Sequence, residues 1–215
     1  EQIELAANGD DLALTSTGRI ALLGARNGPQ LNLQFDADSS ALGSILGKFG
    51  LKVPVRGSAA ARGQLTGVRG SYGLETLSMT FKGEHVSVNA SGQVTQLRKG
   101  GPTVNLQFDA VSDSIRPIGE RLGYAIPFDE LSVAAQGALT GKRGGFRVED
   151  LSLKIDSDVL KARATGGITR LGAGGPELEL AVDVQSGQFQ AFVERLGHQL
   201  PLDGKAVARG DLSGT

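Results

Sequence analysis

The sequence has no cysteine and no tryptophan, and aromatic residues make up only 5% of its 215 positions. Without thiols the chain forms no disulfide, no thiolate nucleophile and no cysteine-ligated zinc site, a composition that suits an oxidising compartment. No apolar run approaches the roughly 20 residues of a membrane-spanning helix, and no signal peptide is visible. Aliphatic side chains and backbone hydrogen bonds must therefore hold the fold together.

An excess of charge of one sign is also missing. The 22 lysines and arginines are balanced by 23 aspartates and glutamates, which gives a net charge of −1, and no run of basic residues exceeds two. This balance disfavours binding to nucleic acid, and it disfavours electrostatic attachment to a membrane surface. We expect no nucleic-acid partner.

Residues suited to catalysis are scarce. His85 and His198 are the only histidines, and neither recurs at an equivalent position elsewhere in the chain; an exposed turn and a helix end are their simplest environments. The signature motifs of esterases, zinc proteases and P-loop nucleotide-binding proteins are absent. We therefore expect no catalytic residues, no cofactor and no enzymatic activity.

Three carboxylates, Asp36, Asp109 and Asp183, do recur at one position. Each stands alone at the end of a strand-like segment, without the clustered oxygen donors that calcium requires. We expect no metal site, and we assign these aspartates to strand exits or caps.

Repetition is the feature that the sequence has in abundance. Segments 31–54, 104–127 and 178–201 are similar to one another at spacings of 73 and 74 residues, and 32 glycines punctuate the chain. Self-similarity at such a period is typical of stacked units that bury apolar faces against their neighbours. We expect residues 1–30 to close a preceding repeat, 31–103 and 104–177 to form whole repeats, and 178–215 to open a further one, as one continuous segment of a longer protein.

Each copy begins with an amphipathic strand, in which residues such as Leu31, Leu33 and Phe35 alternate with polar ones. A stripe of apolar residues at helical spacing follows, preceded by a serine and ended by a glycine. The stripes contain Leu42, Ile45, Leu46 and Phe49, then Ile115, Ile118 and Leu122, then Phe189, Phe192, Val193 and Leu196; the expected N-caps are Ser39, Ser112 or Ser114, and Ser186, and the expected C′ residues are Gly50, Gly123 and Gly197.

Three more strands complete the repeat. One keeps small residues such as Ala59, Ala61 and Gly63 on one face, the next is amphipathic, and the last returns after a turn at residues 83–84 or 157–158. We place the second return strand from Val159 through Ala164. The sequence thus predicts a mainly β, elongated repeat array of antiparallel-rich strands, with one short helix in each repeat of 73 to 74 residues.

The strands present more apolar surface than the helices can cover. One helix of about ten residues is roughly 15 Å long, whereas the four strands of a repeat are ~25 Å each. The rest of the apolar face must meet another sheet, curl on itself or hold an apolar guest. The candidate lining residues are Leu31, Leu33, Phe35, Leu77, Met79, Phe81, Val86, Val88, Val104, Leu106, Phe108, Leu151, Leu153 and Ile155; the helical residues Leu42, Phe49, Ile115, Leu122, Phe189 and Leu196 are assigned to packing.

Several features recur in a fixed order. A strand and a short helix lead to Leu-Gly and then to Val53-Pro54, Ile126-Pro127 or Leu200-Pro201; next come a small-residue strand ending in L-T/S-G, an E-D-L-S-L strand (Phe146 to Ile155) and a glycine-bearing return strand. This order resembles the AsmA-like family of Gram-negative envelope proteins. The resemblance implies a periplasmic, inner-membrane-anchored protein whose repeats form a curved, taco-like β-groove for phospholipid transport between the membranes.

Under this resemblance the candidate lining residues bind phospholipid acyl chains, and other parts of the parent protein contact the membranes. Other envelope proteins are further candidate partners. The alternative is a scaffold or assembly factor for outer-membrane protein biogenesis, in which protein alone packs the apolar face and no lipid passes.

Overall fold

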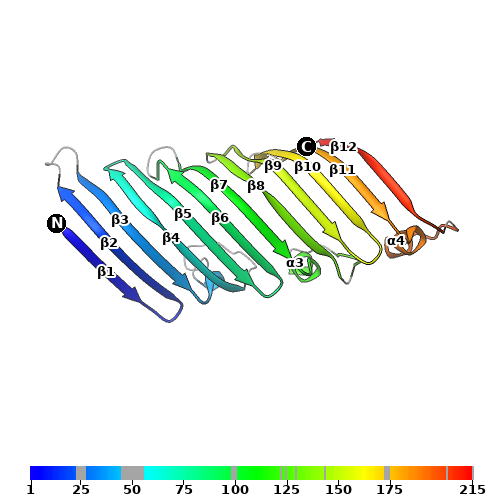
Figure 1. The fold of residues 1–215 in the computed structure, drawn as a ribbon, viewed down its shortest axis with the longest axis horizontal. Coiled ribbons are helices and arrows are strands. Elements are labelled where there is room, and N and C mark those ends of the chain that lie inside the picture. The colour runs from blue at the N-terminus through cyan, green and yellow to red at the C-terminus, as the bar shows by residue number, and fades with distance from the viewer. Residues whose placement is uncertain are drawn as a thin grey trace.

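The computed structural model describes residues 1–22, 28–44, 56–97, 101–121, 123, 125–128, 130–142, 144–171, 175–201 and 203–214. These residues form one sheet of twelve antiparallel strands, in which each strand lies beside the strands that precede and follow it in the sequence (Figure 1). The strands are β1 (Gln2–Asn8), β2 (Leu12–Leu22), β3 (Pro29–Ser39), β4 (Gly57–Val68), β5 (Ser71–Gly83), β6 (Val86–Thr95), β7 (Thr103–Ser112), β8 (Ser132–Lys142), β9 (Phe146–Asp156), β10 (Lys161–Leu171), β11 (Glu177–Ser186) and β12 (Ala206–Gly214). The expected mainly β, antiparallel fold is confirmed.

The strands follow a cycle of four. β3, β7 and β11 are amphipathic and lead into the helical segments, and β4, β8 and β12 carry the small residues. β5 and β9 are the next amphipathic strands, and β6 and β10 return. Gly18 in β2 lies 74 residues before Gly92 in β6, so β1 and β2 correspond to the last two strands of the cycle.

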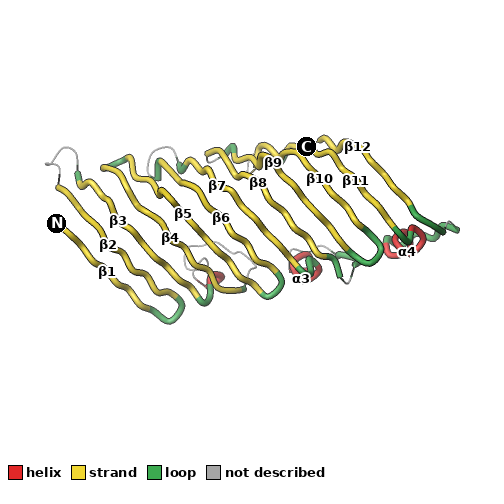
Figure 2. Tube along the Cα trace, viewed as in Figure 1, coloured by secondary structure: helices red, strands yellow, loops and turns green. Residues whose placement is uncertain are grey.

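The helices are short and lie at one end of the strands (Figure 2). They are α3 (Arg116–Arg121) and α4 (Phe189–Arg195), and residues 42–44 form a helical segment at the equivalent place in the first copy. The predictions for Ile45, Leu46, Phe49, Gly50 and Pro54 fall outside the described residues, as does that for Leu122.

The glycines expected to end the second and third helices do so, whereas Ser39, Ser112 and Ser186 do not begin helices. Gly123 and Gly197 both have φ of +83°, and Gly197 donates to the Glu194 carbonyl at 2.9 Å, as a C′ glycine does. The N-cap of α4 is Gln188, not Ser186. Ser186 ends β11, and its Oγ accepts from the backbone N–H of Gln188 at 3.3 Å.

Ser39 accepts from the Ala41 N–H at 3.2 Å in the same way. Ser39 and Ser186 therefore form local turns at the ends of their strands, because each accepts a hydrogen bond from the backbone N–H two residues later. Ser112 also lies in a strand, and its Oγ is buried without a hydrogen-bond partner among the described residues.

α4 and Ile115, the residue just before α3, pack on a small apolar cluster beyond the strand ends. Phe128, Leu131 and Val159 are buried there, and the Phe128 ring stacks on Phe192 of α4 with 6.1 Å between ring centroids. We expected Val159 to begin the return strand, which is wrong. Val159 lies in the turn before β10, where it is buried against Phe128 and Leu131 in the apolar cluster.

Recurrent glycines bring neighbouring backbones close together. Gly18, Gly92 and Gly166 have φ of 155°, 146° and 148°. A Cβ on these glycines would stand 2.1, 2.1 and 2.0 Å from a carbonyl oxygen of the next strand. No other residue type fits either the conformation or the space, because the added carbon would collide with backbone that is itself held in the ladder.

We expect Gly92→Ala to lower the free energy of unfolding by about 2–3 kcal/mol, because both φ and the contact with Asn105 oppose a side chain. Chemical denaturation followed by circular dichroism measures the change. Gly187→Ala is the matched control, since Gly187 has no atom within 4 Å of the added carbon. Equal stability of the two variants would contradict this account of the recurrent glycine.

An ion pair ties α4 to the turn between β9 and β10. The two terminal nitrogens of the Arg195 guanidinium, Nη1 and Nη2, donate to the Asp158 carboxylate at 2.7 and 2.6 Å. The hydrogen bonds from Arg195 lower the pKa of Asp158 below its ordinary value. The stabilisation is therefore present above the ordinary carboxyl pKa and is lost as the pH falls through the lowered pKa.

Asp158→Asn should make the protein slightly less stable at neutral pH and no less stable at a pH below the lowered pKa. Urea denaturation at both pH values checks this, with Asp211→Asn as the control for removal of an exposed carboxylate. A difference that persists undiminished in acid would show that the loss does not come from the ion pair.

Candidate apolar binding face

The strand register places all fourteen candidate residues on one face of the sheet. Residues directly opposite each other in antiparallel strands point to the same side. Phe81 pairs with Val88, Ala90 pairs with Phe108, and Phe108 pairs with Gly137. The same alignment continues from β3 through β10 and includes Leu31, Leu33, Phe35, Leu77, Met79, Phe81, Val86, Val88, Val104, Leu106, Phe108, Leu151, Leu153 and Ile155. We call this side the apolar face.

The fourteen residues differ in their burial. Leu33, Leu77, Leu106 and Leu151 are only 8%, 4%, 8% and 8% exposed, and the other ten are half-buried. The register sets each of these four leucines opposite one of the recurrent glycines: Gly18, Gly92 or Gly166. A leucine can settle into the space that a glycine leaves, so these four are stability positions and the half-buried ten are the accessible ones.

Two phenylalanine rings also lie over glycines. A Cβ on Gly63 would stand 3.1 Å from the ring of Phe35, and a Cβ on Gly137 would stand 3.3 Å from the ring of Phe108. The small residues predicted for β4 and β8 thus admit the rings of the preceding strands. The small residues also suggest close approach of the helical stripe, which is wrong, because the described helices lie at one end of the strands (Figure 2).

Two bulges shift the alternation, so that the sequence pattern alone does not reveal two members of the apolar face. Thr76 and Asp150 have positive φ, of 49° and 52°, in β5 and β9. Across each bulge, the spacing between successive residues of the apolar face is three instead of two. The residues displaced in this way are Leu74 and Val148. Leu65, Val94, Leu139 and Ile168 lie opposite them on the same face and follow the regular alternation of their own strands. The spacing of three that separates Leu74 from Leu77 and Val148 from Leu151, repeated in both copies, was the available signal.

Among the described residues, cover for the apolar face is confined to one end. Ile155 and Ile115 pack against the cluster of Phe128, Leu131 and Val159 near the helices. Ile155 is therefore a packing residue as well as a face residue, and the packing assignment of Ile115 is confirmed. The packing assignment of Leu196 is wrong, because its side chain is exposed.

The opposite, polar face carries cross-strand ion pairs. Asp36 lies 2.8 Å from Nε of Arg62, and Asp183 lies 2.7 Å from Nε of Arg209. The role expected for Asp36, Asp109 and Asp183 at strand exits is wrong, because all three lie within strands. Asp36 and Asp183 pair with the residue directly opposite on the next strand. The hydrogen bond from Arg209 lowers the pKa of Asp183.

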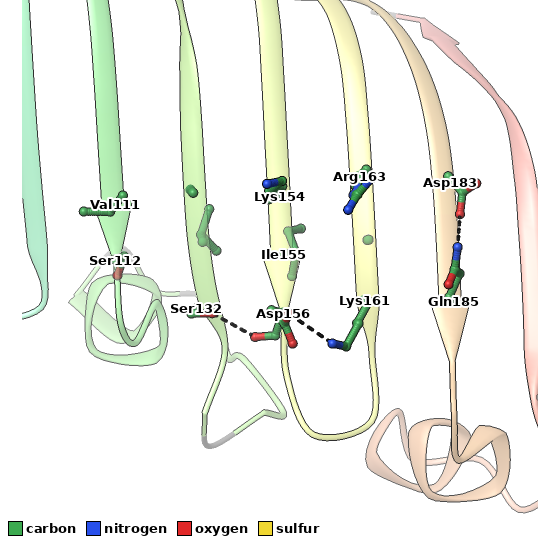
Figure 3. Close-up of a pocket in the computed structure, with 13 residues that line it drawn as sticks. Val111, Ser112, Ser132, Lys154, Ile155, Asp156, Lys161, Arg163, Asp183 and Gln185 are labelled. Atoms are coloured by element: carbon green, nitrogen blue, oxygen red, sulfur yellow. Dashed lines mark hydrogen bonds and ion pairs between the residues drawn. The ribbon is translucent and has the colours of Figure 1, made fainter.

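The described clefts open on the polar face. One of about 530 Å³ is lined by thirteen residues, which include Lys154, Asp156, Lys161, Arg163 and Asp183 on three neighbouring strands (Figure 3). Others of about 520, 390 and 480 Å³ are lined mostly by polar residues of the same side. The twelve described strands form an open sheet that does not close on itself, in agreement with the curved, groove-like sheet expected from the sequence.

No described group of three or more histidine, cysteine, aspartate or glutamate side chains could hold a metal ion. His85 lies in the turn between β5 and β6, with Nδ1 3.1 Å from Asp113, and His198 is exposed after α4. No helix in the described ranges has the length and hydropathy to cross a membrane. No family model, curated protein or solved structure matches the chain.

Leu106→Asp should lower the free energy of unfolding by about 3 kcal/mol or more, because it places a charge among buried aliphatic side chains. Gln107→Asp is the matched control, since Gln107 is the next residue in β7 and is exposed on the polar face. Urea denaturation of both variants tests the assignment of faces. Comparable losses would show that the two sides of β7 do not differ as described.

Proposed function

We propose that this chain is a segment of a bridge-like phospholipid conduit between the inner and outer membranes, and that acyl chains bind along its apolar face. The proposal places the protein in the AsmA-like family and in the periplasm, as part of an inner-membrane-anchored parent. One observation carries it: the apolar face continues through eight consecutive strands, β3 to β10, and no described layer covers it beyond the helix end.

The chemistry of the face supports movement of the lipid as well as its binding. An acyl chain of about 16 carbons gains on the order of 13 kcal/mol on leaving water, at ~0.8 kcal/mol per methylene. A conduit must offer a similar gain at every position, so that no site becomes a trap. Leucine, valine, isoleucine and alanine recur at the same register positions in each repeat. Most polar and charged side chains of the strands point to the other face, and Ser16, Tyr72 and Ser112 are exceptions that share the apolar face.

The rival function is a scaffold for envelope assembly with no lipid passage. The half-buried residues of the apolar face make it a second candidate, because another protein could cover them as well as a lipid could. In that case the apolar face is covered by protein, and lipid never reaches it.

Site-specific photo-crosslinking from Leu153 separates the two functions. Leu153 is half-buried on the apolar face, and Ser152 is its neighbour on the other side of β9. With a photoreactive residue in the parent protein in cells, we expect phospholipid attached at position 153 and little at position 152, as detected by mass spectrometry. Crosslinks to protein alone at position 153, with no copurifying phospholipid, would favour the scaffold.

Leu153→Asp should impair phospholipid transfer in the parent protein while leaving most of the fold intact, because position 153 is accessible and not fully packed. Transfer between membranes is measured with labelled phospholipid, and folding by circular dichroism. Ser152→Asp carries the same charge on the polar face and should leave transfer unchanged. Normal transfer by a folded Leu153→Asp variant would refute the conduit at this position.

A further inference from the structure

A row of side chains crosses the polar face close to the helix end of the second repeat. The row runs from β7 to β11 through Val111, Ala134, Lys154, Arg163 and Asp183, each of which pairs with the next. All of them line the cleft of about 530 Å³ that Figure 3 shows. Two cations, Lys154 and Arg163, therefore stand directly opposite each other within one cleft.

The carboxylates of this cleft are held by other cations. Asp183 accepts a hydrogen bond from Nε of Arg209 at 2.7 Å, and Asp156 lies 3.5 Å from Nζ of Lys161. The hydrogen bond from Arg209 is the largest cause of the lowered pKa of Asp183, and the charge of Arg163 makes a smaller contribution. The cleft is lined by three cations and two carboxylates, so positive charge is in excess there.

Lys154 and Arg163 are left without a hydrogen-bonded carboxylate in the described ranges. Both side chains are exposed, and like charges directly opposite each other in an antiparallel pair destabilise that pair. In the first repeat, 74 residues earlier, Thr80 pairs with Asn89 at the equivalent place, and a cleft of about 520 Å³ opens there as well. Strand pairing at this place therefore requires no cations. A local rule that is broken in one repeat and kept in the other indicates a function for the two cations.

We propose that Lys154 and Arg163 together bind a phosphate group, and that the natural ligand carries this group as a phosphomonoester. A phosphomonoester has a charge of about −1.5 to −2 at neutral pH, which matches two cations, whereas a carboxylate would balance only one. The guanidinium of Arg163 can donate a planar fork of N–H groups to two phosphate oxygens, and the ammonium of Lys154 adds a compact charge. Beside Lys154, the small side chain of Ala134 leaves the cleft open to such a ligand.

This site lies on the opposite side of the sheet from the apolar face, so it goes beyond the proposed function and does not depend on it. Its ligand is either a small soluble phosphomonoester or a phospholipid whose headgroup presents a phosphomonoester at a membrane surface. Because the cleft is open and its cations are exposed, binding should be weak, and it should weaken further as salt screens the charges.

Urea denaturation in inorganic phosphate, with sodium chloride at equal ionic strength as the reference, tests the site. A ligand that binds the folded state raises the urea midpoint in a saturable way, whereas general stabilisation by excluded phosphate keeps growing with concentration. We expect a saturable rise for the unchanged chain and a several-fold smaller rise for Lys154→Thr combined with Arg163→Asn, which installs the residues of the first repeat.

Two features keep this comparison interpretable. Without phosphate the double variant should be at least as stable as the unchanged chain, because it removes a pair of like charges. Lys82→Thr is the matched control, since it removes an exposed cation from the equivalent cleft of the first repeat and should keep the full phosphate response.

Two phosphomonoester probes then distinguish the sources of the ligand. Glycerol phosphate represents a soluble ligand, and vesicles of phosphatidic acid in phosphatidylcholine represent a membrane surface. Cosedimentation with these vesicles that is lost in the double variant assigns the site to a lipid headgroup, and a saturable response to glycerol phosphate without cosedimentation assigns it to a soluble ligand. Absence of a saturable phosphate response in the unchanged chain, or an equal response in the double variant, would overturn the proposal.

Discussion

The backbone hydrogen-bond ladder between neighbouring strands is the interaction on which the structure depends. In the described part of the chain no second sheet packs on the first, and the helices reach only the strand ends. Each strand is therefore held by the two beside it, through the ladder and through side chains that touch across it. The recurrent glycines matter for this reason: Gly18, Gly92 and Gly166 let the ladder run where any Cβ would separate the strands.

The ladder also explains how one face stays apolar across strands that contain irregularities. An extra residue in a strand normally moves every later side chain to the other side. The bulges at Thr76 and Asp150 do this at the same point of two repeats, and the sequence compensates with a spacing of three between apolar residues. Without that compensation, half of β5 and half of β9 would present polar groups among the leucines.

Much of this architecture could be predicted from the sequence because its causes are local. Alternation in segments such as Leu31 to Phe35 indicates a strand, and Gly123 and Gly197 lie at helix ends because only glycine readily adopts the φ required there. The alternation also identified the face of all fourteen candidates correctly. Their burial could not be predicted, because it depends on which residue of the neighbouring strand is a glycine.

The errors arose where the cause lies far away in the sequence. Asp36 resembled a strand exit because its partner, Arg62, belongs to the next strand. Val159 has the composition of a strand residue, but Phe128 and Leu131 of an earlier segment bury it in a turn. The bulges were missed because an alternation pattern assumes a constant period. In each case the deciding contact forms only after the sheet has assembled.

The sequential order of the strands governs how the molecule would respond to tension. A sheet in which each strand touches only its sequence neighbours has no central element whose loss dissolves the whole. Pulled from its two ends, such a chain yields one hairpin at a time, and the remainder keeps its pairing. Rupture and rejoining would thus be local events, a mechanical tolerance suited to a long, thin body under strain along its length.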